Sequence, residues 1–350
     1  SYPHAFGYVG GIRVLSNNRV LIADPLGKVL VAIDIDRRTA DTLGRVGGGP
    51  QEYQQPDAVF ALPGDSTLLT DLGNGRLTIV GPDGTFGQTS PIAREGANGR
   101  LTIVLPRFVD TLGRIYYQPE TFTAGGPVDS AAILRFDRSS GQVDTLGSIM
   151  LSPVSQSRVG ARVRLSRGPL NLRDDWAVGA DGSVAIIHAR DYSVEWVFPS
   201  GERTAGPSNE YRRIAIGRAE KELWLENQAV ESINVLTRMS AAGERTMQFS
   251  RGGGGSGRGI DAYEWPADLP PFRPNRSFVT PGGNLWVERY VRASSDPVID
   301  VFDSRAVKVA EVLLPPNRRV AAFGDDSVFL VHTDDVGLQC LERYRVLGNE

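Results

Sequence analysis

The stretch Trp176-Ala-Val-Gly-Ala-Asp-Gly-Ser-Val-Ala-Ile-Ile-His188 consists of two apolar runs joined by the turn Ala180-Asp-Gly-Ser183. Apolar runs joined by turns rich in Gly, Asp and Asn are typical of β-hairpins. The same thirteen-residue pattern occurs six times without a gap, at residues 12–24, 59–71, 107–119, 176–188, 277–289 and 320–332. Six such hairpins predict the inner strands of six blades in an all-β propeller.

The spacing of the repeats locates two insertions. The repeat starts lie 47, 48, 69, 101 and 43 residues apart, whereas a four-stranded blade needs about 40–50 residues. We therefore expect a single six-bladed propeller over residues 1–350, with an Arg-rich insertion at 149–175 and a helical and Gly-rich insertion at 207–275. The second insertion lies between blades four and five.

The second insertion contains three different patterns. Residues 210–239 are rich in helix formers with apolar residues near helical spacing, which predicts one helix or two short ones. A strand is expected at 246–250. Residues 251–259 contain six glycines, and we expect this segment to be mobile unless a partner orders it.

Blade six lacks the residues for a fourth strand, because the chain ends six residues after Tyr344. An apolar run at residues 5–9 precedes the first repeat, and we expect it to supply the fourth strand of blade six. Its pairing with the last blade would close the ring and remove an exposed sheet edge. The sequence therefore predicts a propeller that is closed by its N-terminal strand.

Composition excludes several classes of function. The formal net charge of −3 gives no general attraction to nucleic acid. The single cysteine, Cys340, cannot form a disulfide within the chain, and we expect it to be a core or edge residue and no cysteine-based metal site to exist. No stretch is apolar enough to span a bilayer. The first residue is Ser1, interpreted as a processed end, which predicts an extracytoplasmic protein of the periplasm or cell envelope.

A family resemblance rests on the second repeat. Gly47-Gly-Gly-Pro-Gln-Glu-Tyr53, the hairpin that follows it, Gly75-Arg-Leu-Thr-Ile-Val80 and Pro82-Asp-Gly84 together resemble one NHL repeat. Trp265-Pro-Ala-Asp-Leu-Pro-Pro271 resembles segments of exported bacterial six-bladed propellers. The resemblance to this bacterial β-propeller family implies the fold and leaves the function open, because such propellers act as binding modules, scaffolds, sensors and enzymes.

The last position of the repeat is polar in most blades. The residues there are Asp24, Asp71, Pro119, His188, Arg289 and His332. One interpretation is a metal or polar-ligand site, because imidazole and carboxylate groups both bind divalent ions. The other is that these side chains bond to the backbone of the loops they border. Blades four and six are not neighbours, so the two histidines should lie far apart.

Propeller lactonases of the regucalcin and paraoxonase kind hold a divalent ion in the central channel, on carboxylate and amide side chains. This chain has no obvious counterpart set. Its repeats begin with Ile12, Val59, Arg107, Trp176, Ser277 and Val320. It also has no His-Glu-x-x-His, phosphate-binding loop or nucleophile-elbow motif. We therefore predict no catalytic residue, no metal ligand and no cofactor.

The insertions offer the best candidates for contact with a partner. The first contains five arginines with no acid among them, namely Arg158, Arg162, Arg164, Arg167 and Arg173. Guanidinium groups suit acidic protein surfaces or lipid headgroups, although a solvated loop paired with Asp174 and Asp175 is the alternative. Trp265 is either an anchor for a partner or a seal of the insertion onto blade five.

Two functions follow from these patterns. The main prediction is a non-catalytic structural propeller, exported and docked through its insertions on the extracytoplasmic face of a larger membrane assembly, such as a respiratory or photosynthetic complex. It would bind protein partners, would not bind nucleic acid and would have no transmembrane segment. The alternative is a divalent-metal-dependent lactonase or hydrolase with its site in the central channel.

Overall fold

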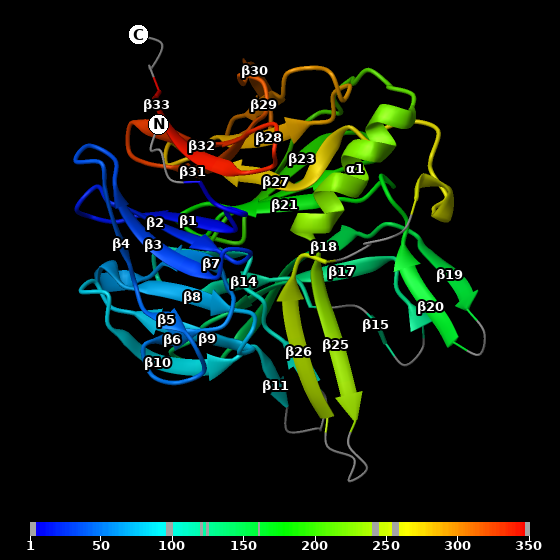
Figure 1. Ribbon diagram of the computed structural model, residues 1–350. Helices are drawn as coiled ribbons and strands as arrows, with labels where there is room; N and C mark the ends of the chain where they lie inside the picture. The colour runs from blue at the N-terminus through cyan, green and yellow to red at the C-terminus, as the bar shows by residue number, and fades with distance from the viewer. Residues whose placement is uncertain are drawn as a thin grey trace. The chain divides into compact units, whose positions relative to one another are not determined.

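The computed structural model describes residues 5–95, 101–119, 122–123, 126–159, 162–239, 245–253 and 259–346. Its strands form the six blades of the propeller that the repeats predict (Figure 1). By backbone contacts the chain divides into two compact units. Unit one comprises Ser1–Gly113, Asn227–Ser256 and Asn317–Glu350, and unit two comprises Arg114–Glu226 and Gly257–Pro316. Whether they act as one domain stays a prediction.

Unit one holds the first, second and sixth blades. The first consists of β1 (Gly11–Val14), β2 (Val20–Asp24), β3 (Val29–Asp34) and β4 (Thr39–Thr42). The second consists of β7 (Pro56–Ala61), β8 (Thr67–Asp71), β9 (Arg76–Val80) and β10 (Phe86–Pro91). The sixth consists of β31 (Arg318–Phe323), β32 (Ser327–Thr333) and β33 (Gln339–Arg345). The strands of each blade pair in sequence order and antiparallel.

Shorter elements complete unit one. They are β5 (Arg45–Val46), β6 (Glu52–Tyr53), the 3-10 turn η1 (Pro63–Asp65), β11 (Ala93–Glu95), β12 (Leu101–Ile103), β13 (Phe108–Val109), β25 (Ile233–Met239) and β26 (Arg245–Arg251). The last two strands pair with each other as a hairpin.

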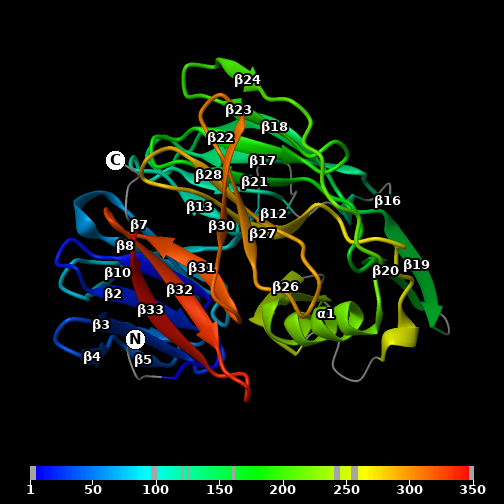
Figure 2. The same cartoon turned by 90° about the horizontal axis from the view of Figure 1, so that it is seen from above.

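The first blade shows why the inner strands are apolar on both faces. Alternate side chains of a strand point to opposite faces of its sheet. In β2, Val20 and Ile22 pack with Phe329 and Val331 of the sixth blade. Leu21 and Ala23, on the opposite face, pack with side chains of the second blade. Stacked blades thus bury both faces of β2, which explains the nearly continuous apolar run of this repeat. Figure 2 shows the first and sixth blades side by side.

The N-terminal segment pairs with the last blade, as the sequence predicts, but only at one residue. The Phe6 N–H donates to the Gln339 carbonyl at 2.7 Å, and the Gln339 N–H donates to the Phe6 carbonyl at 2.9 Å. The next two N–H groups, of Gly7 and Tyr8, donate to the Asp24 carboxylate instead. These two bonds take the place of further backbone pairing with β33, and the Val9 N–H donates to the Gln339 side chain at 2.8 Å. The predicted strand at residues 5–9 is thus reduced to a bridge.

Deleting residues 1–9 should lower the free energy of unfolding by several kcal/mol. The deletion removes Phe6 and Val9 from a buried cluster and uncovers the edge of β33, and loss of one buried Phe side chain alone costs about 3–5 kcal/mol. Urea unfolding measures the change. A deletion of residues 1–4, which leaves both side chains in place, is the control. Equal unfolding midpoints for the two deletions would contradict the closure.

Unit two holds the other blades. The third includes β14 (Ile115–Tyr117), β17 (Ser130–Phe136) and β18 (Val143–Met150). The fourth consists of β21 (Asp175–Val178), β22 (Val184–His188), β23 (Ser193–Val197) and β24 (Arg203–Ala205). The fifth consists of β27 (Phe272–Val279), β28 (Leu285–Arg289), β29 (Val298–Phe302) and β30 (Lys308–Leu313). Shorter elements are β15 (Phe122–Thr123), β16 (Gly126–Pro127), β19 (Val154–Val159), β20 (Arg162–Arg167) and the 3-10 turn η2 (Ile260–Ala262).

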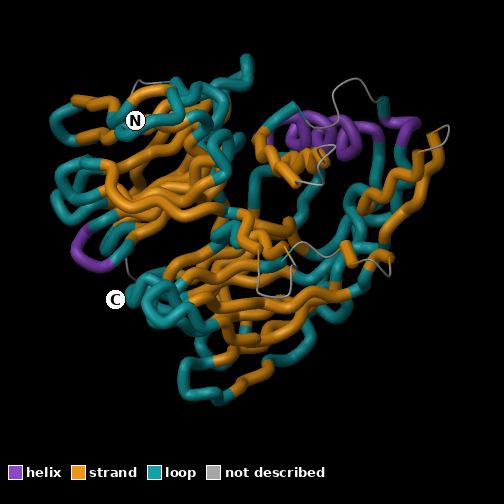
Figure 3. The backbone as a smooth tube through the Cα atoms, turned by 90° about the horizontal axis from the view of Figure 1, so that it is seen from below, coloured by secondary structure: helices purple, strands orange, loops and turns teal. Residues whose placement is uncertain are grey.

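The helical prediction for residues 210–239 is correct for one helix and wrong at both ends, because residues 210–217 are not helical and residues 233–239 form a strand. α1 (Arg218–Glu231) is the one α-helix among the described residues, and strands dominate the rest (Figure 3). Residues 233–239 form β25, which pairs with β26 from Ile233 opposite Arg251 to Met239 opposite Arg245. The β-branched residues Ile233, Val235 and Thr237 at every second position favour this strand. The strand expected at 246–250 is confirmed as β26.

Two further expectations concern the insertions and the membrane. The Arg-rich insertion contains the hairpin β19–β20 rather than a loop. Most of the Gly-rich segment, residues 254–258, lies outside the described residues. No helix in the described part of the chain is long and apolar enough to cross a membrane.

Candidate functional site

The aspartates at the last position of the repeat accept hydrogen bonds from backbone N–H groups of adjacent loops. In unit one, Asp24 accepts the N–H groups of Gly7 at 2.8 Å and Gly27 at 2.7 Å. Asp71 likewise accepts the N–H groups of Gln54 and Gln55, at 3.1 and 3.0 Å. The interpretation as local backbone bonding is therefore correct for both carboxylates.

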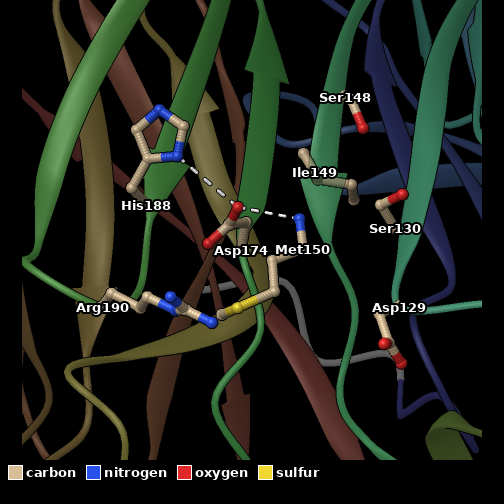
Figure 4. A pocket seen from close by; sticks show the side chains of 8 residues that line it. All are labelled: Asp129, Ser130, Ser148, Ile149, Met150, Asp174, His188 and Arg190. Carbon is tan, nitrogen blue, oxygen red and sulfur yellow. Dashed lines mark hydrogen bonds and ion pairs between the residues drawn. The ribbon is translucent and has the colours of Figure 1, made fainter.

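His188, at the same position in blade four, has a different environment. It ends β22, and Asp174 immediately precedes β21, the strand beside it. The Nδ1 of His188 lies 3.5 Å from Oδ2 of Asp174, as an ion pair (Figure 4). The Asp174 carboxylate also accepts the N–H groups of Met150 at 2.8 Å and Ala189 at 2.9 Å. These bonds fix the carboxylate, and through it the imidazole ring.

The pair shifts both acid–base equilibria. The interaction with Asp174 raises the pKa of His188 and outweighs the burial that would lower it. Burial alone would raise the pKa of Asp174, but His188 and the two backbone N–H groups outweigh it and hold that pKa below its usual value. The other ring nitrogen, Nε2, lies 3.6 Å from Oε2 of Glu195 in a second ion pair, which also acts to raise the pKa of His188. The side chain of Asp174 is 7% exposed and that of His188 is 35% exposed, so the ring reaches solvent while its partner does not.

His188 and Asp174 belong to a pocket of about 320 Å³ in unit two. Its lining contains a second carboxylate, a guanidinium and two hydroxyl groups. The lining residues are Asp129, Ser130, Ser148, Ile149, Met150, Asp174, His188 and Arg190 (Figure 4). The volume is at the lower end of the range for small-molecule sites. The pocket therefore combines an acid–base group, a cation and hydrogen-bonding hydroxyls around space for a small polar ligand.

Sequence reasoning identified His188 and missed the rest of this pocket. Asp174 lies two residues before the repeat, and the sequence suggested only that it pairs with arginines. Arg190 lies two residues after the repeat. Ser130 and Ser148 belong to blade three and reach the pocket because β18 packs beside β22. The polar residues that flank the repeat could have indicated a site. Only the packing of blade three against blade four shows which of these residues line the same pocket.

The partner-binding residues predicted from the sequence do not line this pocket. The backbone register sets Arg158 opposite Val163, Arg162 opposite Val159, and Arg164 opposite Ser157. Arg167 donates hydrogen bonds to the carbonyls of Ser152 and Val128. Arg173 is partly buried. A role of these arginines in binding a partner stays a prediction.

Trp265 packs within its own insertion. Its ring lies edge-to-face against Trp224 at 5.5 Å and Tyr263 at 5.9 Å between centroids. Its Nε1–H donates to the Ile260 carbonyl at 2.9 Å, and Lys221 Nζ lies 5.5 Å from the ring centroid. These contacts join the segment after the Gly-rich stretch to α1. A role as an anchor for a partner stays a prediction.

The potential metal ligands do not resemble a calcium site. Within the described residues, one group of three or more His, Cys, Asp or Glu side chains has ligand atoms within 4.8 Å of one another: His332, Cys340 and Glu342 in unit one. It offers one nitrogen, one sulfur and one carboxylate, whereas calcium takes six to eight oxygen ligands. This group is therefore not an oxygen-rich calcium site.

Comparison with known proteins finds structural similarity at low sequence identity. No protein-family model and no curated protein matches the sequence. A solved member of the DUF4221 family from Bacteroides vulgatus is similar over 98% of this chain and 95% of its own, with 8% identity and a TM-score of 0.48. A luciferin-regenerating enzyme is similar over 99% and 94%, with 11% identity and a TM-score of 0.47. A gluconolactonase from Xanthomonas campestris is similar over 98% and 88%, with 13% identity and a TM-score of 0.45. No match tests the NHL resemblance.

These comparisons correct the main functional prediction. Several of the matched structures carry the names of enzymes, namely gluconolactonase, luciferin-regenerating enzyme and virginiamycin B lyase, and another is named a calcium-binding protein, regucalcin. The prediction of a non-catalytic subunit docked on a membrane assembly is therefore wrong, and the alternative, a lactonase or hydrolase, agrees better with them. At identities of 8–13% and TM-scores of 0.45–0.48 this likeness assigns no activity to the chain, so an activity has to be argued from the residues of the chain itself.

Proposed function

We propose that this protein is a hydrolase that cleaves small polar lactones or esters with water in the pocket around His188. The observation that carries the proposal is the ion pair of Asp174 with His188 on the wall of a 320 Å³ pocket. Asp174 is fixed by two backbone N–H groups and is nearly buried, while the histidine ring reaches solvent. A buried carboxylate that orients a partly exposed imidazole is a recurring arrangement for general acid–base catalysis.

The chemistry follows from the two ring nitrogens. Asp174 holds the proton on Nδ1, so the lone pair of Nε2, which lies 3.6 Å from the Glu195 carboxylate, accepts a proton from water. The water oxygen then attacks the carbonyl carbon of the substrate, the ring C–O bond breaks, and the proton passes from Nε2 to the leaving oxygen. The product is a hydroxy acid. The guanidinium of Arg190, which lines the same pocket, would stabilise the negative charge that develops on the carbonyl oxygen.

The rate of lactone or ester hydrolysis against pH tests this proposal. A general base must be neutral, and Asp174 raises the pKa of His188 above its ordinary value of about 6.5. For wild type we therefore expect kcat/KM to rise with pH and to level off only above that value. Asp174→Asn removes the charge that raises the pKa, so its curve should rise at lower pH and reach a lower plateau.

The experiment uses the purified protein, a panel of γ- and δ-lactones and aryl esters, and a pH indicator or the released phenol as the readout. Asp181→Asn is the matched control, because Asp181 lies in the turn of the same blade and bonds to Ser183. It should leave the curve unchanged. The proposal fails if folded wild type hydrolyses no member of the panel, or if Asp174→Asn has the wild-type curve.

A further inference from the structure

A second cluster of reactive side chains lies on the sixth blade, in unit one. The register of β32 and β33 sets His332 directly opposite Cys340. Their Nδ1 and Sγ atoms are 3.7 Å apart. Glu342 is two residues further along β33 and therefore lies on the same face as Cys340. One ligand atom from each of the three residues lies within 4.8 Å of the other two, and all three residues are partly buried.

The carboxylate of this cluster is held in place by its neighbours. Arg318 on β31 contacts both of its oxygens, with Nε–Oε2 at 2.8 Å and Nη2–Oε1 at 2.9 Å. The Tyr344 hydroxyl donates to Oε2 at 2.9 Å. A carboxylate oxygen can accept more than one bond, so these contacts orient Glu342 without using up its capacity. Outer partners of this kind are typical of carboxylates and histidines that bind metals.

We infer that His332, Cys340 and Glu342 form a zinc site. A set of one imidazole nitrogen, one thiolate sulfur and one carboxylate oxygen suits zinc, whereas magnesium and calcium prefer oxygen ligands only. Three protein ligands leave one of four tetrahedral positions for water or another small ligand. On binding, zinc takes the place of the thiol proton, which passes to solvent. Partial burial gives the ion access while the strand pairing fixes the ligands.

This inference differs from the expectation of no cysteine-based metal site. A lone cysteine gives no spacing motif, and seven residues separate His332 from Cys340 in the sequence. The antiparallel turn between β32 and β33 brings the two side chains opposite each other. No residue of the cluster lines the His188 pocket, so the zinc site stands independently of the proposed hydrolase.

Zinc binding can be measured without any assay of activity. Because Cys340 is the only cysteine, a thiol-reactive reagent reports on this site alone. We expect titration calorimetry to find one zinc ion per chain, and one equivalent of zinc to slow thiol modification at least tenfold. Cobalt in place of zinc should give the sulfur-to-cobalt absorption band of a bound thiolate.

The variants Cys340→Ser, His332→Gln and Glu342→Gln should each weaken zinc binding by about tenfold or more. Asp335→Asn is the control, because Asp335 is an exposed acid in the turn of the same hairpin, and its affinity should equal that of wild type. Far-UV circular dichroism checks that each variant is folded. If zinc leaves the thiol of wild type fully reactive, or if folded His332→Gln binds zinc as wild type does, the site is refuted. His188→Gln should still bind zinc with wild-type affinity. Failure of the zinc site and failure of the proposed hydrolase can therefore be told apart.

Discussion

Replacing Asp57 by alanine should lower the free energy of unfolding of unit one by about 3–5 kcal/mol, the cost of leaving one partner of a buried ion pair alone. Asp57 on β7 and Arg251 at the end of β26 form a bidentate pair, in which Nε bonds to Oδ1 and Nη2 bonds to Oδ2 at 3.0 Å. Their side chains are 5% and 12% exposed. Water therefore cannot replace the lost carboxylate, and the guanidinium would remain charged among apolar and aromatic groups.

Other contacts of Arg251 explain why it cannot simply move into solvent. Its Nη1 donates to the Glu231 carbonyl at the end of α1 at 2.6 Å. Its backbone N–H donates to Oε1 of Gln55 at 2.8 Å, and its guanidinium lies 5.3 Å from the ring centroid of Tyr8. One side chain thus joins the second blade, the β25–β26 hairpin and the N-terminal segment within unit one. Loss of Asp57 removes the bidentate ion pair that balances this charge.

The double variant Asp57→Ala, Arg251→Met distinguishes a buried unpaired charge from a general loss of packing. It removes both charges, so it should be more stable than Asp57→Ala alone. Glu222→Gln is the control, since it breaks an exposed pair with Arg218 on α1 and should cost under about 0.5 kcal/mol. Far-UV circular dichroism is the readout, because all five tryptophans lie in unit two. A cost below 1 kcal/mol for Asp57→Ala, or a double variant less stable than the single one, would contradict this account.

The parts of the fold that depend on local patterns could be predicted from the sequence. Each inner hairpin carries its own apolar runs and turn residues, so six repeats predicted six blades without any knowledge of their contacts. The helical spacing at 210–239 gave α1 but extended too far, because β25 becomes a strand by pairing with β26 across residues 240–244. That pairing is a contact between two segments, and spacing within one segment does not show it.

The two candidate sites also depend on contacts between segments that the sequence does not show. His188 stood out because it occupied one position of the repeat, but Asp174 and Arg190 lie just outside the repeat and Ser130 and Ser148 come from another blade. Cys340 had no partner until the strand register placed His332 opposite it. The sequence thus names residue types that are able to react, and the pairing and packing of strands decide which of them meet.

Replacing His188 by glutamine should lower kcat/KM for the best lactone or ester by about 10²–10⁴-fold, the usual contribution of a positioned general acid–base group. Glutamine keeps polarity and similar length but cannot accept a proton at neutral pH. The fall should appear mainly in kcat, since the ring acts on the attacking water rather than on the bound substrate. Arg305→Gln, at an exposed turn of unit two where Arg305 pairs with Asp303, is the control and should keep wild-type rates.

A structural role of His188 would also reduce the rate, so the decisive measurement is chemical rescue. His188→Gly opens space where the ring was, and free imidazole in the buffer can occupy it next to Asp174. If His188 transfers the proton, added imidazole should restore part of kcat in proportion to its neutral fraction, with a pH profile that follows imidazole itself. Asp174→Asn with His188→Gly should respond less, because the carboxylate that orients the base is gone. A rate that imidazole leaves unchanged, in a variant that unfolds as wild type does, would show that His188 is not the base of this pocket.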